Sequence, residues 1–139
     1  MARGRKPERI GGDGTAEVLD PPEWLNDDAA AEWRRVAPEL ATRRTLTDAD
    51  LWALETYCLQ VAQARQMQAT IDALNDPFVY SEGGVPRPHP AFRAQRDAMT
   101  VARQFAGELG LTPAARLRVR GETPKGGNDE DGWSGLVDG

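Results

Sequence analysis

One segment of the chain carries the start signal of an unusually long helix. Residues 46–51 read Leu-Thr-Asp-Ala-Asp-Leu. Thr47 can cap free backbone N–H groups, and Asp50, three residues later, can reach back to it in a capping box. The two flanking leucines stand at the positions of a hydrophobic staple. Because an apolar periodicity then continues without a proline, the pattern predicts a helix over 48–75, longer than the average globular helix.

The apolar residues of this helix are expected to form one buried stripe. They recur every three or four positions, which places them on a single helical face. Trp52 and Cys58 lie beside the stripe and are expected to widen the buried surface. The stripe consists of Leu51, Leu54, Tyr57, Val61, Ala64, Met67, Ile71 and Leu74.

Two other helical patterns flank the long one. The first follows Asn26, a good N-cap, and predicts a helix over 27–41 that Pro38 should kink or shorten. The second begins on a proline, a favourable first residue, and predicts a helix over 90–109 that Gly110 ends. The expected buried face of this second helix is formed by Phe92, Met99, Ala102, Phe105 and Leu109.

Between the two long helices, the sequence predicts a small β-hairpin. Residues 78–80 and 85–87 are the expected strands, and the Gly-Gly pair at 83–84 can supply the positive φ angles of a tight turn. The prolines at 86 and 88 keep the strands short. Since an isolated hairpin is marginal in water, it must pack on a helix or on a neighbouring subunit.

These elements predict a mainly α-helical fold. Its centre is a long antiparallel helical hairpin, with a preceding helix, the small β-hairpin between the long helices, and a short C-terminal helix that begins at Thr112-Pro113. The ends of the chain have little apolar content, which predicts disorder. The expected organisation is a disordered basic arm (1–20), a helical core (21–120) and a disordered acidic tail (121–139).

The residue inventory gives little support to catalysis. Cys58 is the only cysteine and His89 the only histidine, so the usual structural zinc sites cannot be built. The chain has neither a GxxxxGK[ST] phosphate loop nor a GxSxG elbow, and the carboxylates near the first two helices are expected to be caps and solvated side chains. We expect no enzymatic activity, cofactor or metal. The lone cysteine fits a reducing compartment, and no apolar run is long enough to span a bilayer.

Charge is distributed in blocks along the chain, although its net value is -5. The N-terminal Arg-Gly-Arg-Lys-Pro at 3–7 resembles the core of minor-groove AT-hook peptides, the alternative being a solubilising terminus. A second basic group follows the last long helix, where it could contact phosphate or simply favour a helix C-terminus. Arg96 and Arg103, seven residues apart, are expected to project together. The candidate DNA contacts are Arg3, Arg5, Lys6, Arg9, Arg116, Arg118 and Arg120.

The acidic tail contains apolar residues that have no local core to join. Trp133, Leu136 and Val137 follow directly after Asp129-Glu130-Asp131. A tryptophan in an otherwise polar tail is typical of a short linear anchor that becomes ordered when it docks on a partner. We expect these three residues to contact another protein.

Several short motifs follow one another between residues 4 and 120. They are Gly4-Arg5-Lys6-Pro7, Pro22-Glu23-Trp24-Leu25, Ala31-Glu32-Trp33, Leu46-Thr47-Asp48-Ala49-Asp50, Tyr57-Cys58, His89-Pro90 and Glu108-Leu109-Gly110-Leu111-Thr112-Pro113-Ala114-Ala115-Arg116. This ordered set resembles the small terminase subunit of tailed double-stranded DNA phages and prophages. The Leu-Gly-Leu-Thr-Pro-x-x-Arg ending is its most specific part.

The resemblance implies a non-enzymatic DNA-recognition component of a genome-packaging motor. Such subunits form homo-oligomeric rings of about eight to eleven copies and bind viral DNA at the packaging initiation site. They recruit the large terminase subunit, which carries the ATPase and nuclease activities. The resemblance thus implies that residues 21–120 form the oligomerisation core, that the tail anchor docks on the large subunit, and that the protein acts in the cytoplasm of the infected bacterial host. One departure is the arm itself, which after Lys6 becomes less basic than expected.

Two other functions stay open on the residues alone. A dimeric helix-turn-helix transcriptional regulator would place Arg43-Arg44 beside a recognition helix. An acidic structural or adaptor protein would not contact DNA. The mass in solution separates the dimer from the ring, and salt-dependent DNA binding separates the adaptor from both.

Overall fold

A computed structural model describes residues 19–43 and 45–119 and confirms the mainly α-helical fold. A single 3₁₀ turn, η1, precedes the longest helix. In chain order the elements are α1 (Asp27–Thr42), η1 (Asp48–Asp50), α2 (Leu51–Asp72), β1 (Phe78–Tyr80), β2 (Pro86–Pro88), α3 (Pro90–Glu108) and α4 (Pro113–Val119).

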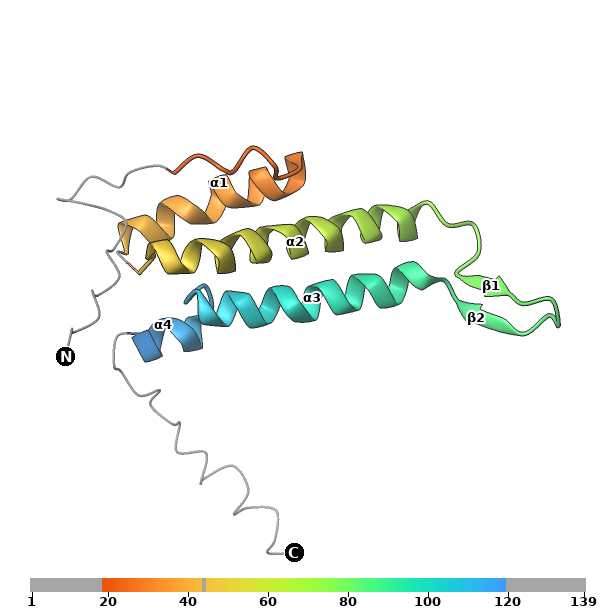
Figure 1. Ribbon diagram of the computed structural model, residues 1–139. Helices are drawn as coiled ribbons and strands as arrows, with labels where there is room; N and C mark the ends of the chain where they lie inside the picture. Colours follow the sequence, from red (N-terminus) through yellow and green to blue (C-terminus); the bar gives the residue numbers. More distant parts are fainter. Residues whose placement is uncertain (1–18, 44, 120–139) are drawn as a thin grey trace, which may run out of the picture.

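The three longer helices lie side by side in one elongated body (Figure 1). α2 is in the middle and packs against α1 on one side and α3 on the other. α1 covers only the first part of α2, whereas α3 runs along most of its length. The β1–β2 hairpin extends beyond the far ends of α2 and α3, away from α1 and α4. The predicted helical hairpin of α2 and α3 is therefore the centre of the fold.

The start of the α2 region is built as its sequence signal predicts. The Asp50 carboxylate accepts hydrogen bonds from the Thr47 backbone N–H at 2.9 Å and from the Thr47 hydroxyl at 2.7 Å. Leu46 is fully buried in the core and Leu51 packs against that core. The helical segment ends at Asp72, three residues before the predicted position. The capping box thus fixes where the longest element begins.

The expected shortening of the first helix by Pro38 is not seen. α1 starts where the Asn26 side chain accepts a 2.9 Å hydrogen bond from the Ala29 N–H, as predicted. It continues through Pro38 to Thr42, so the proline does not shorten it. The Thr42 hydroxyl donates a 2.8 Å hydrogen bond to the Pro38 carbonyl, which gives the last turn an additional bond.

Local signals also set the ends of the hairpin and of α3. Gly84 adopts a φ of 73° in the turn, and the second strand begins one residue later than predicted. His89 is the N-cap of α3, since its Nδ1 accepts a 3.1 Å hydrogen bond from the Ala91 N–H. Gly110, with a φ of 72°, follows the C-cap of α3 as predicted. The only histidine thus has a structural role as a helix cap.

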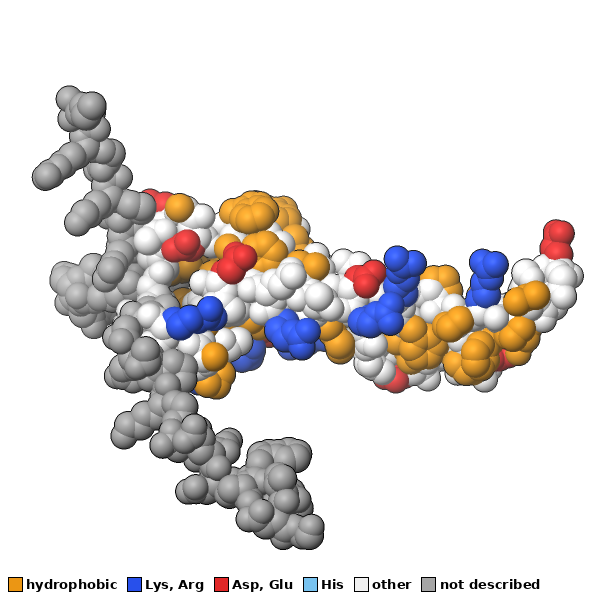
Figure 2. All heavy atoms as spheres, turned by 90° about the horizontal axis from the view of Figure 1, so that it is seen from below, with side chains coloured by type: hydrophobic (Ala, Val, Ile, Leu, Met, Phe, Trp, Pro, Cys, Tyr) orange, Lys and Arg blue, Asp and Glu red, His pale blue; other side chains and the backbone are white. Residues whose placement is uncertain are grey.

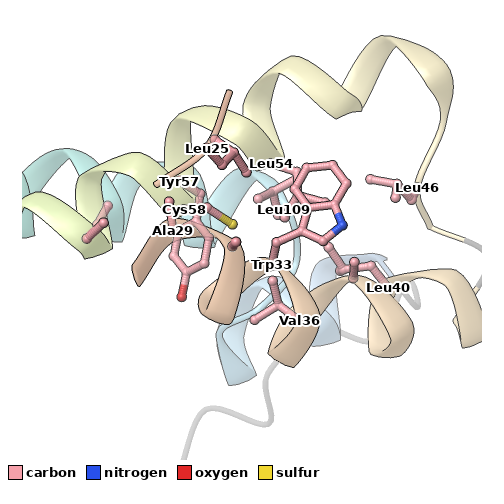
Figure 3. Close-up of a cluster of buried hydrophobic side chains, with 14 residues drawn as sticks. Leu25, Ala29, Trp33, Val36, Leu40, Leu46, Leu54, Tyr57, Cys58 and Leu109 are labelled. Carbon is pink, nitrogen blue, oxygen red and sulfur yellow. The ribbon is translucent and has the colours of Figure 1, made fainter. Parts of the chain in front are cut away.

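The hydrophobic core lies at the end of the body where α1, α2 and the C-terminal part of α3 meet (Figure 3). Trp33 is its largest side chain and is only 2% exposed. The Trp33 indole N–H donates a 2.9 Å hydrogen bond to the Leu19 carbonyl, so its polar atom is satisfied within the core. Cys58 is fully buried in the same cluster, as predicted.

Two residues predicted to be buried are exposed instead. Trp52 is 66% exposed, and its ring meets only the edge of Phe105, with the ring centroids 5.6 Å apart. Met99 is 52% exposed. Both predictions are wrong because helices cover α2 and α3 on some sides only. A side chain next to the apolar stripe is therefore left facing outward.

Candidate nucleic-acid and subunit interfaces

The predicted DNA contacts fall mostly at the ends of the chain. Arg116 and Arg118 lie on α4, where Arg116 is half-buried and Arg118 is exposed. Residues two apart on a helix project about 200° apart, so these two side chains do not share a face. Outside the described residues lie Arg3, Arg5, Lys6, Arg9 and Arg120, together with the predicted docking residues Trp133, Leu136 and Val137.

A further row of arginines lies on α3. Arg93, Arg96 and Arg103 are all exposed, at spacings of three and seven residues that bring them to one side of the helix. The ion pair that Arg93 makes with Asp97, at 3.7 Å, is exposed. Such a pair is weak, so the Arg93 charge remains available to a partner. Figure 2, a view from below, shows basic side chains at intervals along the elongated body. The seven-residue spacing predicted that Arg96 and Arg103 would project together, whereas Arg93 was missed.

The interface between α1 and α2 contains a buried carboxylate. Glu32 of α1 is only 1% exposed. It accepts a 2.8 Å hydrogen bond from the Tyr57 hydroxyl and a 3.2 Å hydrogen bond from the Arg65 guanidinium, both of α2. Arg35, one turn further along α1, also pairs with it. Both arginines are more than half exposed, so the buried carboxylate is neutralised by cations that remain in contact with water. No buried polar side-chain atom of the network is left without a partner.

The prediction that the early carboxylates are caps or solvated side chains is wrong for Glu32. The signal that could have found it is its place on α1, since Glu32 stands in the same helical stripe as Ala29, Trp33 and Val36. A charged residue on a buried stripe must find partners. Those partners come from α2, and the sequence of α1 alone does not identify them.

The network changes the acidity of its members. Burial alone would raise the pKa of Glu32, but hydrogen bonds from Arg35 and Tyr57, together with the charges of the arginines, lower it overall. Burial, followed by the hydrogen bond to Glu32, raises the pKa of Tyr57 to about 12. Burial also raises the pKa of Cys58 to about 12, with a smaller contribution from Glu32. Glu32 is therefore held as a carboxylate, and the thiol is held protonated.

An open groove of about 360 Å³ lies between α2 and α3. Its walls are mostly apolar, with Met99 as its most exposed apolar residue, and Arg65 is among the residues that line it. Beyond it, Gln95 of α3 hydrogen-bonds to Gln68 of α2. The groove is lined by Val61, Ala64, Arg65, Gln68, Met99 and Ala102.

Apolar residues are also exposed on the β1–β2 hairpin. Phe78 is 46% exposed and Tyr80 is 60% exposed, and every residue from 75 to 88 is exposed. Val79 and Val85 are exposed as well. A concentration of exposed apolar side chains is typical of an interaction site rather than of an ordinary solvated surface.

The described residues offer no arrangement for metal chemistry. No group of three or more His, Cys, Asp or Glu side chains within them could hold a metal ion. Among the helices that the structure describes, none is both long and apolar enough to cross a membrane. The arrangement is instead suited to contacts with macromolecules, through charged and apolar surfaces.

Comparison with known families gave a match. The profile of the family described as phage terminase, small subunit, matches residues 29–126, which is more than half of the chain. The matched region includes all but the first two residues of α1, both long helices of the helical hairpin, the β-hairpin and α4. Comparisons with curated proteins and with solved structures gave no match.

Proposed function

Because this chain belongs to the phage terminase small-subunit family, we propose that it recognises viral DNA at the packaging initiation site, assembles as a ring and recruits the large subunit. The observation that carries the proposal is the family match over residues 29–126, which spans the helical hairpin and its exposed surfaces. The protein itself would be non-catalytic, and it would act in the cytoplasm of the infected bacterial host. ATPase and nuclease activities would belong to the large subunit.

Ring assembly requires two different surfaces on each subunit, because a closed ring is built from head-to-tail contacts. The chain offers candidates at separate places, namely the groove between α2 and α3 and the exposed β1–β2 hairpin. The remaining helix surfaces are available for lateral packing. This supply of distinct apolar surfaces supports a ring over an isolated protomer.

DNA binding would use the basic ends of the chain. Contacts of this kind neutralise phosphate and release counterions, so they weaken as salt is raised. The net charge of -5 does not oppose them, because the acidic residues occupy other segments. The proposed contacts are Arg3, Arg5, Lys6, Arg9, Arg116, Arg118 and Arg120.

Recruitment of the large subunit would use the acidic tail. Trp133, Leu136 and Val137 would anchor on an apolar site of that partner. The adjacent carboxylates would set the orientation of the tail on the partner's surface. A pull-down of the large subunit by the full chain, and by Trp133→Ala as a matched variant, tests this role. Equal capture by both chains would contradict it.

The central test of the proposal is native mass spectrometry of the full chain with and without duplex DNA. We expect one closed homo-oligomer, and a DNA-bound form with the same number of subunits. A dimer that binds DNA would instead support a helix-turn-helix regulator. An oligomer whose affinity for a fluorescein-labelled duplex is unaffected by salt would contradict the DNA-binding role.

A further inference from the structure

One face of the β1–β2 hairpin is entirely apolar. In the antiparallel register, Phe78 is opposite Pro88 and Tyr80 is opposite Pro86. Alternate residues of a strand point to opposite sides, and directly paired residues point to the same side, so these four side chains share one face. The other face carries Val79, which is opposite Arg87. The hairpin therefore has one aromatic and proline-rich face and one mixed face.

Nothing in the described part of the chain covers the aromatic face. Every residue from 75 to 88 is exposed, and the hairpin extends beyond the ends of the helices (Figure 1). Two strands of three residues are not stable by themselves in water. The sequence required that the hairpin pack on a helix or on a neighbouring subunit, and its own helices do not cover it. In a ring, the surface nearest to an uncovered hairpin is that of a second copy of the chain.

The groove between α2 and α3 has the complementary chemistry. Its walls are mainly aliphatic, and its volume of about 360 Å³ is within the range of ~300–1,000 Å³ that is usual for binding pockets. Arg65 lines it, and Arg96 and Arg103 stand three residues before and four residues after Met99, which makes them its neighbours on the surface of α3. The groove is therefore apolar inside and basic at its edge.

The hairpin carries the opposite charge. Glu82 lies in its turn, and Asp76 precedes β1, where its carboxylate accepts a 2.9 Å hydrogen bond from the Phe78 N–H. This bond holds the Asp76 carboxylate next to Phe78 of the aromatic face, and its negative charge also raises the pKa of Tyr80. An apolar face with acidic neighbours matches an apolar groove with basic neighbours.

We propose that the aromatic face of the β1–β2 hairpin docks in the α2–α3 groove of an adjacent copy of this chain. The proposal rests on the ring assembly proposed above and identifies its contact surfaces. The two aromatic side chains supply on the order of 300 Å² of apolar area. A specific interface buries ~800 Å² per partner, so the hairpin contact is one part of each subunit boundary and the adjoining helix surfaces supply the rest.

A photo-cross-link tests the contact in the full-length chain. Tyr80 is replaced by p-benzoylphenylalanine, isotopically light and heavy copies are mixed and reassembled, and the cross-linked peptides are identified by mass spectrometry after irradiation. We expect light-to-heavy links from position 80 to residues 61–68 or 99–102. Links to residues 120–139, links within one copy only, or no links in an intact ring would overturn the proposal.

Paired substitutions separate this contact from ring assembly in general. We expect Phe78→Ser with Tyr80→Ser to replace the ring by monomer in native mass spectra, because both changes are on the aromatic face. Val79→Ser with Val85→Ser makes a similar change of polarity on the other face and is expected to keep the ring. If the aromatic pair also keeps the ring, the contact is overturned while the proposed function stands. If the unmodified chain forms no ring, the proposed assembly itself fails.

Circular dichroism controls for folding in the same variants. All four substituted side chains are exposed, so the helical signal of each variant is expected to equal that of the unmodified chain. A variant that lost helical signal would be replaced by the charge reversal Glu82→Arg, in the exposed turn. That change is expected to weaken the ring, with a loss that grows as salt is lowered, because it places like charges together. An unchanged ring in Glu82→Arg would count against the charge match.

Discussion

The Tyr57 hydroxyl of α2 donates a 2.8 Å hydrogen bond to Oε1 of Glu32 of α1, at a position from which water is excluded. This bond joins the first helix to the central one and gives the buried carboxylate a partner from another element. Arg65, from the next part of α2, pairs with the second carboxylate oxygen. The position of α1 on α2 is therefore set by a polar network as well as by apolar packing.

Removing the Tyr57 hydroxyl should lower the stability of the fold. We expect Tyr57→Phe to lower the free energy of unfolding by about 1.5 kcal/mol, the lower end for a hydrogen bond to a charged group, because Glu32 keeps its arginine partners. Thr70→Val, which removes an exposed hydroxyl from the same helix, is the control and should change it by less than ~0.5 kcal/mol. Urea denaturation at one fixed protein concentration measures both. Equal midpoints for the two variants would contradict the role of the bond.

Acid should weaken the fold through Glu32. Its pKa is lowered in the folded state, since the arginine and tyrosine contacts outweigh the effect of burial. The folded protein therefore holds this proton less tightly than the unfolded chain, for which the pKa is ~4.3. The stabilisation is complete above the unfolded value and is lost as the pH falls through the folded value.

The variant Glu32→Gln tests this dependence. We expect the difference in unfolding free energy between the unmodified chain and the variant to be largest near neutral pH and to shrink as the pH falls below ~4.3. Glu23→Gln, at an exposed position before α1, serves as the control and should show no such change. A difference that stays constant with pH would show that the charge of Glu32 does not contribute.

Local capping chemistry explains why so much of the fold could be predicted. Thr47, Asp50 and Gly110 act through hydrogen bonds and φ angles of their immediate neighbours, and each stands in the structure where its sequence signal placed it. Glu32 and Trp52 were misjudged because their environments depend on which helices cover α1 and α2. Periodicity identifies a face of a helix, but the extent of its coverage is set by tertiary packing.

The candidate interfaces also divide into features set by local sequence and features set by tertiary packing. The shortness of the hairpin strands follows from the prolines, which were evident in the sequence, whereas the sequence left open whether a helix or a neighbouring subunit covers them. The groove between α2 and α3 could not be predicted, since it depends on side chains from helices that are about thirty residues apart in the chain. Met99 was predicted to be buried because its spacing fits the stripe, yet it lies at the open side of that groove.

Two glycines near the end of α3 should respond in opposite directions to alanine. Gly110 has a φ of 72°, which an alanine adopts only with strain, so Gly110→Ala should lower the free energy of unfolding by about 1 kcal/mol. Gly107 lies within the helix, and an added Cβ would have no atom within 4 Å, so Gly107→Ala should raise it by about 0.5–1 kcal/mol. Thermal unfolding of both variants gives the signs. A shared sign would be inconsistent with these backbone conformations.

The Cys58 thiol should be unreactive while the chain is folded. It is fully buried, and burial raises its pKa to about 12, so the thiolate that reacts with disulfide reagents is scarce. We expect Ellman's reagent to react within seconds in denaturant and far more slowly under native conditions at about pH 8. Ser81→Cys adds a thiol at an exposed turn position and should give one rapid equivalent in the folded state. Rapid reaction of the unmodified folded chain would contradict the buried position of Cys58.

The salt dependence of DNA binding tests the proposed basic arm residue by residue. If Arg5 contacts a phosphate, Arg5→Ala should reduce the slope of log K against log salt by ~0.9, because one fewer counterion is released. Arg34→Ala makes the same change of charge at an exposed position of α1 outside the proposed contacts, and its slope should stay unchanged. Fluorescence anisotropy with a labelled duplex at several salt concentrations measures both slopes. Equal slopes for Arg5→Ala and Arg34→Ala would contradict a phosphate contact by Arg5. A reduced slope for Arg118→Ala would support the contact proposed on α4.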